Sequence, residues 1–205
     1  MNKEQVILIG AGGHTRSLIT IINYDKYDIV GIYDDSFSPN RNEYIGSVPV
    51  VGKLDDIPIG NHLIIAAGNL ATKKKYTEMF KEHLVDYNFS HSTTIIEQEV
   101  SLGTRNQFFA GVIVNAFTKI GNDNIVNSGA IIEHEAKIGN NNHISVGAVL
   151  CGRAKIGNNC FIGASAVIID GIELGDQITI GANSVVINDI TEPGTYVGNP
   201  AKKIK

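Results

Sequence analysis

Large apolar side chains recur at every sixth position through the second half of the chain, from Ile96 to Val186 without a break. Five of these positions, eighteen residues apart, are each followed by glycine: Leu102, Ile120, Ile138, Ile156 and Leu174. A period of six nested in a period of eighteen is typical of neither an amphipathic helix nor a half-buried strand. It predicts a solenoid whose coil has three short sides.

A second column of mostly small side chains lies two residues before each large apolar one. Because residues two apart on a strand face the same way, both columns are expected to fill the interior of a narrow prism. Asn106, Asn124 and Asn142 belong to this column and should stack as a ladder. Cys151 and Cys160 are half a coil apart, so we expect them on different sides without a disulfide.

The first ninety residues follow a different pattern, in which short apolar runs alternate with helical spacing. The expected elements are strands over 6–9, 29–33 and 62–67 and helices over 14–23 and 72–83. A strand, a glycine-rich turn, a helix and a second strand begin a doubly wound α/β unit. We therefore predict an α/β, Rossmann-like domain over residues 1–90, followed by an all-β solenoid domain over residues 91–205.

Composition narrows the possible partners. The net charge is −4 and the pI is about 5.8, so no excess of positive charge suggests nucleic acid or an acidic membrane. The N-terminus lacks a charged leader followed by an apolar segment and a cleavage site, and no apolar run is long enough to span a bilayer. We expect a soluble, cytoplasmic protein.

The hexapeptide pattern, together with the terminal Tyr196-Val197-Gly198-Asn199-Pro200-Ala201-Lys202, resembles the left-handed β-helix acyltransferases. The leading Ile7-Leu8-Ile9-Gly10-Ala11-Gly12-Gly13-His14 is similar to sugar acetyltransferases of bacterial glycan biosynthesis. These include sialic acid O-acetyltransferase-like proteins and N-acetyltransferases of the bacillosamine and perosamine pathways. The resemblance covers nearly the whole chain. It implies a left-handed helix, a homotrimer, acetyl-CoA as co-substrate and no metal.

His134 is the first candidate for catalysis, because it should face outward near a corner of the prism. Acyl transfer to an amine or hydroxyl needs a base, and imidazole has a suitable pKa. From the residues alone, an exposed surface histidine is the alternative. The resemblance implies that His134 is the general base and that Glu135 orients it. Neighbours on an extended strand point in opposite directions, so this needs a twist at the corner, and Glu133 competes for the role.

His143 follows His134 by half a coil, so the two should lie on different sides of one prism. They could converge only across an interface between parallel prisms, which hints at active sites shared between subunits. The resemblance supports His143 as a residue near the acetyl carbonyl of the cofactor, serving as an oxyanion donor. A backbone N–H is an equally good donor.

The glycine-rich turn after the first strand is a candidate phosphate site, formed by Gly10, Gly12 and Gly13. Backbone N–H groups at such a turn can hold a phosphate at a helix N-terminus. Thr15 occupies the third glycine position of the dinucleotide fingerprint, which weakens that interpretation. A tight strand-to-helix turn is the alternative.

Two carboxylates, Asp34 and Asp35, close the second strand, where an acid can bind a ribose or a base edge. The resemblance implies that this pocket holds a nucleotide-linked sugar instead of a dinucleotide. It also places His14 near the pyrophosphate or the sugar.

Acetyl-CoA needs a groove for its extended pantetheine arm, and a groove between two prisms suits it. The C-terminal coils offer small residues at which a ligand could approach the backbone. These are Gly163, Ala164, Gly181 and Ala182.

The predicted function is acetyl-CoA-dependent N-acetylation of the 4-amino group of a nucleotide-linked 4-amino-4,6-dideoxysugar. The product would serve a bacterial surface glycan such as lipopolysaccharide O-antigen, capsule or a glycoprotein glycan. An O-acetyltransferase acting on sialic acid or a related sugar is the nearest alternative. A metal-dependent hydratase would need three converging histidines, whereas the solenoid offers only His134 and His143, with His91 just before it. A non-catalytic scaffold or nucleotide-binding module is the remaining alternative.

Overall fold

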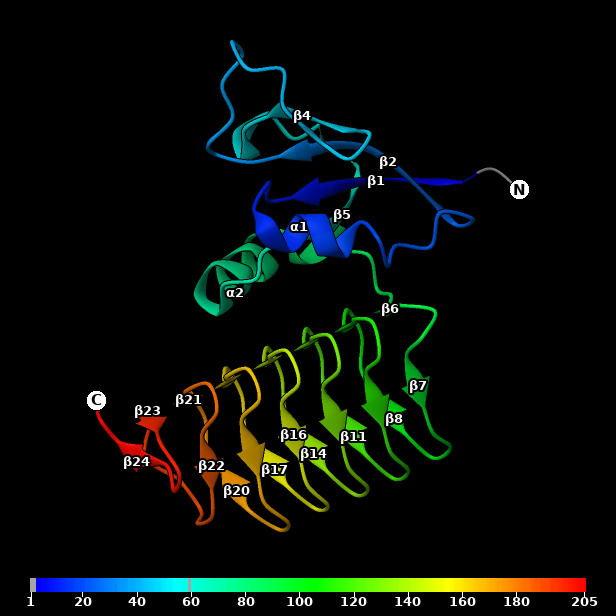
Figure 1. Cartoon of the computed structure of the whole chain (residues 1–205). Coiled ribbons are helices and arrows are strands. Elements are labelled where there is room, and N and C mark those ends of the chain that lie inside the picture. The colour runs from blue at the N-terminus through cyan, green and yellow to red at the C-terminus, as the bar shows by residue number, and fades with distance from the viewer. Residues whose placement is uncertain (1–2, 59) are drawn as a thin grey trace. The chain divides into compact units, whose positions relative to one another are not determined.

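The computed structural model describes residues 3–58 and 60–205 and divides the chain into two compact units (Figure 1). The first unit is Met1–Asp86 and the second is Tyr87–Lys205. The division lies a few residues before the boundary expected from the sequence. The reason is that β6 (Phe89–Ser90) already pairs with β9 (Gln107–Phe108) of the second unit.

The first unit is built on one five-stranded sheet with the strand order β3-β4-β2-β1-β5. Its strands are β1 (Glu4–Ile9), β2 (Tyr27–Tyr33), β3 (Tyr44–Ile45), β4 (Val48–Gly52) and β5 (His62–Ile65). All neighbours are parallel except β3 and β4, which form a hairpin that the sequence analysis did not anticipate. From β1 the chain adds β2, β4 and β3 on one side of the sheet, and β5 then pairs with the other side of β1. The carboxyl ends of β1 and β5 therefore flank a topological switch point.

Two helices accompany this sheet, α1 (Gly13–Leu18) and α2 (Leu70–Met79), with 3-10 turns at Leu54–Asp56 and Lys81–His83. α1 is shorter than predicted, because the N–H groups of Thr20 and Ile21 bond three residues back and tighten its end. α2 starts earlier than predicted, at the cap Asn69, whose Oδ1 accepts the Thr72 N–H at 3.0 Å. No helix in the described residues is long and apolar enough to cross a membrane.

The second unit is a parallel solenoid whose coils present three sheets (Figure 1). Sheet I holds β7 (Ile95–Ile96), β10 (Ile113–Val114), β13 (Ile131–Ile132), β16 (Val149–Leu150), β19 (Val167–Ile168) and β22 (Val185–Val186). Sheet II holds β8 (Ser101–Leu102), β11 (Lys119–Ile120), β14 (Lys137–Ile138), β17 (Lys155–Ile156) and β20 (Glu173–Leu174). Sheet III holds β6, β9, β12 (Ile125–Val126), β15 (His143–Ile144), β18 (Phe161–Ile162), β21 (Ile178–Ile180), β23 (Gly194–Val197) and β24 (Lys202–Lys203). Within the repeating coils, each strand pairs in parallel with the strand eighteen residues further on, as Ile131 does with Val149.

The predicted interior columns are confirmed. Fourteen of the sixteen large apolar positions are buried, from Phe108 to Val186. Leu102 is partly buried, and Ile96 is 38% exposed because β7 is the terminal strand of sheet I. The start of the solenoid therefore carries an incomplete core.

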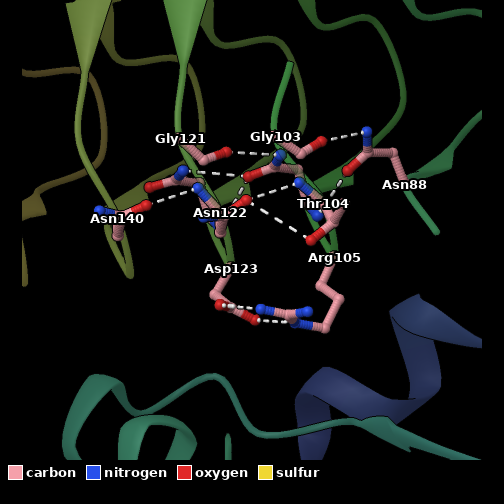
Figure 2. Close-up of polar contacts among 10 residues, drawn as sticks. Asn88, Gly103, Thr104, Arg105, Gly121, Asn122, Asp123 and Asn140 are labelled. Carbon is pink, nitrogen blue, oxygen red and sulfur yellow. Dashed lines mark hydrogen bonds and ion pairs between the residues drawn. The ribbon is translucent and has the colours of Figure 1, made fainter. Parts of the chain in front are cut away.

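The glycines that follow every third apolar position are required by close stacking of the coils (Figure 2). A Cβ at Gly121 would lie 2.5 Å from Asn140 Oδ1 and 2.7 Å from the Gly139 carbonyl oxygen. The amide of Asn140 occupies this space because its Oδ1 accepts the Asn122 N–H at 2.8 Å. The same arrangement recurs at Gly103, so the glycine period is a consequence of a polar ladder along the outside of one corner.

The interior asparagine ladder is also confirmed. Asn106 Oδ1 accepts the Asn124 N–H at 2.9 Å, and Asn124 Oδ1 accepts the Asn142 N–H at 2.9 Å. Asn142 Oδ1 then accepts the Cys160 N–H at 2.7 Å, and Cys160 donates its S–H to the Gly175 carbonyl oxygen at 3.1 Å. Burial raises the pKa of Cys160 to about 11, so the thiol keeps this proton. Both cysteines are free, as expected.

The replacement Asn124→Ala should destabilise the second unit by about 2–4 kcal/mol, because the Asn142 N–H and the Gly139 carbonyl would lose buried partners. Denaturant unfolding measures this loss. The control Asn188→Ala alters an exposed asparagine and should change the free energy of unfolding by less than about 0.5 kcal/mol. Equal effects of the two replacements would contradict a stabilising ladder.

Candidate functional site

His134 lies at the corner between sheets I and II, which we call the I–II corner, after β13 and before β14. Its side chain is 53% exposed, and Nδ1 lies 3.1 Å from Glu135 Oε2. Glu135 has φ +61°, and this left-handed turn brings two consecutive side chains together. The corner therefore supplies the twist on which the expected pairing depends.

Glu133 is directed elsewhere. Its Oε2 accepts a hydrogen bond from Asn115 Nδ2 at 2.9 Å, which ties it to the preceding coil. Of the two glutamates beside His134, Glu135 is thus the one that contacts the imidazole.

Gly152 lies against the imidazole of His134 and was not singled out from the sequence. It is buried, and a Cβ there would lie 2.8 Å from both Cε1 and Nε2 of His134 and 2.9 Å from Asp170 Oδ1. Gly152 follows His134 by eighteen residues, so alignment of the sequence by coils would have identified it. Because Gly152 has no side chain, the imidazole of His134 can lie directly against its backbone, and we call this position the seat of the ring.

An ion pair between the next two coils lies beside Gly152. Arg153 Nε donates to Asp170 Oδ1 at 3.2 Å, and the Arg153 N–H donates to the His134 carbonyl oxygen at 2.9 Å. The hydrogen bond to Asp170 raises the pKa of Arg153. Arg153 belongs to the next coil and Asp170 to the coil after it, so an exposed ion pair that joins these two coils lies on that side of the imidazole.

Cys151 is half-buried at the same corner. Burial, followed by the negative charges of Glu133 and Asp170, raises the pKa of its thiol. A thiol that holds its proton is a poor nucleophile, so nothing at this corner favours a covalent cysteine intermediate.

His143 is the first residue of β15 and lies on sheet III, away from the I–II corner. Its side chain is only 9% exposed, and its ring meets Phe161 edge-on, with centroids 5.1 Å apart and planes at 68°. The structure therefore does not bring His134 and His143 together within one chain.

In the first unit, the glycine-rich turn connects β1 with α1. A Cβ at Gly10, which has φ +110°, would lie 3.0 Å from the Ala66 carbonyl oxygen at the end of β5. At Gly12 and Gly13 a Cβ would meet no atom within 4 Å, so the space in front of them is open. Buried Thr15 donates its hydroxyl to the Gly10 carbonyl oxygen at 2.7 Å and thereby fastens the turn.

Asp34 ties the end of β2 to the same turn. Its Oδ2 accepts the Ala11 N–H at 2.7 Å and its Oδ1 accepts the Ser36 N–H at 2.8 Å. Burial acts to raise the pKa of Asp34, but the hydrogen bonds from Ser36 and Ala11 prevail and lower it. Asp35 is exposed, and its Oδ1 accepts the Leu54 N–H at 3.4 Å. Asp34 is thus committed to the turn, whereas Asp35 is the more accessible carboxylate.

His14 belongs to α1 and packs against the segment after β5. A Cβ at Gly68 would lie 3.2 Å from His14 Cβ. The predicted residues of the first unit therefore gather where β1, β2 and β5 end, which is the usual ligand side of such a sheet.

The residues predicted to contact CoA stack on successive coils near the C-terminus. A Cβ at Gly163 would lie 2.5 Å from the Ala182 nitrogen, and one at Gly181 would lie 2.6 Å from Val197 Cγ1. Coil stacking alone therefore accounts for both glycines. Ala164 is half-buried and Ala182 is exposed, so these two leave surface for a ligand.

An open groove of about 530 Å³ runs along the outer face of sheet II, lined in part by Lys119, Lys137 and Lys155. Lys155 Nζ pairs with Glu173 Oε2 at 3.0 Å. In the part of the chain that the structure describes, no group of three or more His, Cys, Asp or Glu residues is placed to hold a metal ion.

Two family matches agree with these two units. Residues 5–80 match the family described as PglD N-terminal domain, and residues 153–187 match the hexapeptide repeat of succinyl-transferase. The solved structure of PerB from Caulobacter crescentus, in complex with CoA and GDP-perosamine, is 28% identical. The match covers 98% of this chain and 97% of that one, with a TM-score of 0.88. Both units of the chain are thus similar to those of left-handed β-helix sugar acetyltransferases.

The acetyltransferase domain of PglB from Neisseria gonorrhoeae is 26% identical to this chain, with a TM-score of 0.86. That match covers 98% of this chain and 100% of the other, and a second structure of the domain contains acetyl coenzyme A. Among curated proteins, none matches the sequence. The predicted Rossmann-like domain and left-handed parallel β-helix are thus confirmed.

The replacement Gly152→Ala should displace the imidazole of His134, because the new Cβ would overlap Cε1 and Nε2. A crystal structure of the variant measures the shift in ring position. Cys151→Ala removes atoms from the adjacent residue and should leave the imidazole in place. An unmoved ring in Gly152→Ala would contradict the seat.

Proposed function

We propose that the chain is an acetyl-CoA-dependent N-acetyltransferase acting on the 4-amino group of a nucleotide-linked 4-amino-4,6-dideoxysugar. The observation that carries the proposal is the exposed His134–Glu135 pair at a corner of the β-helix. The similar PerB structure, which contains CoA and GDP-perosamine, supports the pair of substrates. We place the enzyme in the cytoplasm and in the synthesis of a bacterial surface glycan.

His134 serves as the general base in this mechanism. A carboxylate at Nδ1 favours the neutral tautomer with a proton on Nδ1, which leaves Nε2 to accept one. The sugar amine attacks the thioester carbonyl while Nε2 takes the proton from nitrogen. Collapse of the tetrahedral intermediate breaks the carbon–sulfur bond, and the departing thiolate takes the proton from the imidazolium. Glu135 stabilises the positive charge that exists between these steps.

The oxyanion requires a separate donor. His143 is buried on sheet III, so it would reach an acetyl group at His134 only from a neighbouring subunit. A backbone N–H near Gly152, which lies against the imidazole, is the alternative within one chain.

The nucleotide sugar binds, in this proposal, at the carboxyl ends of β1 and β2. The open space at Gly12 and Gly13 suits the pyrophosphate, with His14 beside it. Asp35 is the better placed acid for a ribose or base, because Asp34 already accepts backbone N–H groups. The CoA arm would run along the coils at Ala164 and Ala182, next to Gly163 and Gly181.

A homotrimer with active sites between subunits completes the proposal. The outer face of sheet I carries one aliphatic side chain per coil in register: Ile95, Ile113, Ile131, Val149, Val167 and Val185. Ile95 is 50% exposed and the others are half-buried. A contiguous aliphatic face of a parallel sheet is typical of a surface that another element covers. We assign this face to contacts between subunits.

The replacement His134→Ala should lower kcat/KM by roughly 10²- to 10⁴-fold, because the amine loses its proton acceptor. Thiol release from acetyl-CoA with GDP-perosamine and UDP-linked 4-amino sugars measures the rate. Oligomer size should not change, and the control His83→Ala, at an exposed histidine of the first unit, should keep wild-type activity. Near-wild-type activity of His134→Ala would exclude it as the base.

The same assay tests the reaction class. Turnover of sialic acid alone would favour O-acetylation, and turnover of no sugar at all would refute the proposed function.

The replacement Val167→Asp should convert the trimer into monomers, because it places a charge on the aliphatic face of sheet I. Sedimentation velocity measures the mass, and activity should fall together with it. Lys119→Asp changes charge on sheet II instead and should leave the mass unchanged. A wild-type monomer, or a Val167→Asp trimer, would contradict this assembly.

A further inference from the structure

Every corner of the solenoid is turned by one residue in the left-handed region. These residues recur at every sixth position with φ between +52° and +74°. They are Glu99, Arg105, Gly111, Phe117, Asp123, Gly129, Glu135, Asn141, Gly147, Arg153, Asn159, Ser165, Gly171, Gln177 and Asn183. Fourteen of the fifteen are glycine or polar, and Phe117 alone is apolar.

Phe117 has no evident benefit for folding. A bulky residue is unfavourable at positive φ, where asparagine, aspartate or glycine is preferred. Its side chain is 62% exposed, so burial of the ring does not compensate this cost. Such a conformational cost at an exposed position points to a functional reason.

Phe117 lies beside the proposed catalytic pair. It precedes Glu135 by one coil on the same I–II corner, and the Glu135 N–H donates to the Ala116 carbonyl oxygen at 3.1 Å. Successive coils are about 4.8 Å apart, so the exposed Phe117 lies one coil spacing from Glu135, the partner of His134.

The two neighbours of His134 along the corner differ in chemistry. The preceding coil offers Ala116 and the phenyl ring of Phe117, whereas the following coil offers Gly152 and the charged Arg153, which pairs with Asp170 of the coil beyond. An acceptor sugar that presents an apolar ring face and a methyl group matches the preceding side.

We propose that Phe117 is a substrate-contacting residue on which the apolar face of the acceptor sugar rests, with C6 as a methyl group against the phenyl ring. This inference depends on the proposed function, and it makes Phe117 the residue that selects a 6-deoxysugar as the acceptor. A sugar with a hydroxyl at C6 would place a polar group against the ring without a partner, so it should be a poorer substrate.

Steady-state kinetics of Phe117→Ala with GDP-perosamine and with its 6-hydroxy counterpart tests the inference. The KM for GDP-perosamine should rise about three- to ten-fold, which is the contribution expected of an aromatic contact. The preference for the 6-deoxysugar should fall by a similar factor, and the KM for acetyl-CoA should not change. Phe117→Tyr should restore most of the wild-type KM.

Two further variants separate binding from folding. Phe117→Asn places a residue that tolerates positive φ at this corner, so its Tm should equal or exceed that of the wild type while KM still rises. Tyr44→Ala removes an aromatic side chain of similar exposure, 60%, from β3 of the first unit and should leave both KM values unchanged.

An unchanged KM for the amino sugar in Phe117→Ala would overturn the inference while leaving the proposed function intact. Loss of the trimer in Phe117→Ala would overturn it as well, by identifying the ring as a contact between subunits. If the wild type acetylates neither nucleotide sugar, the proposed function fails and this inference fails with it.

Discussion

Each coil of the solenoid is bonded to the next at a spacing of about 4.8 Å, and most other features of the second unit depend on this spacing. It leaves no room for a Cβ at Gly103 or Gly121, because the amide of the next coil lies in that place. At each corner four residues connect successive strands, as between β13 and β14, and one of them is left-handed. In the interior, the same spacing lets one asparagine side chain form hydrogen bonds with the preceding coil and with the following coil. A column of polar side chains can therefore be buried with its hydrogen bonds satisfied.

The same constraint builds the candidate site. On an extended strand, neighbouring side chains would diverge, but the left-handed turn at Glu135 brings its carboxylate to the imidazole of His134. The coils on either side then determine the surroundings of the ring, with Gly152 as its seat. A family of enzymes can therefore alter what lies next to an unchanged base by substitutions eighteen residues away.

The sequence predicted those features that depend on spacing alone. The buried columns and the ladder from Asn106 to Asn142 follow from a period, so they were predictable. Features that depend on a particular tertiary contact were not. Thr15 looked like a departure from a glycine motif, but its hydroxyl bonds the Gly10 carbonyl in a buried site. Asp34 suggested a ligand contact, although the Ala11 N–H already occupies one of its oxygens. The β3–β4 hairpin was missed because β3 has only two residues, too few to show an alternation.

The two polar ladders bond in opposite directions along the solenoid, and Figure 2 shows the outer one at Thr104, Asn122 and Asn140. In the interior, Asn124 donates its N–H back to the previous coil, whereas at the outer corner Asn122 donates its N–H forward to Asn140. Each pair of adjacent coils is therefore connected by the same two hydrogen bonds, one in each direction. Duplication or deletion of a whole coil of eighteen residues preserves both ladders, whereas a shift of one ladder residue relative to the next breaks the bond between them. Each added or removed coil moves one end of the solenoid by one fixed step relative to His134.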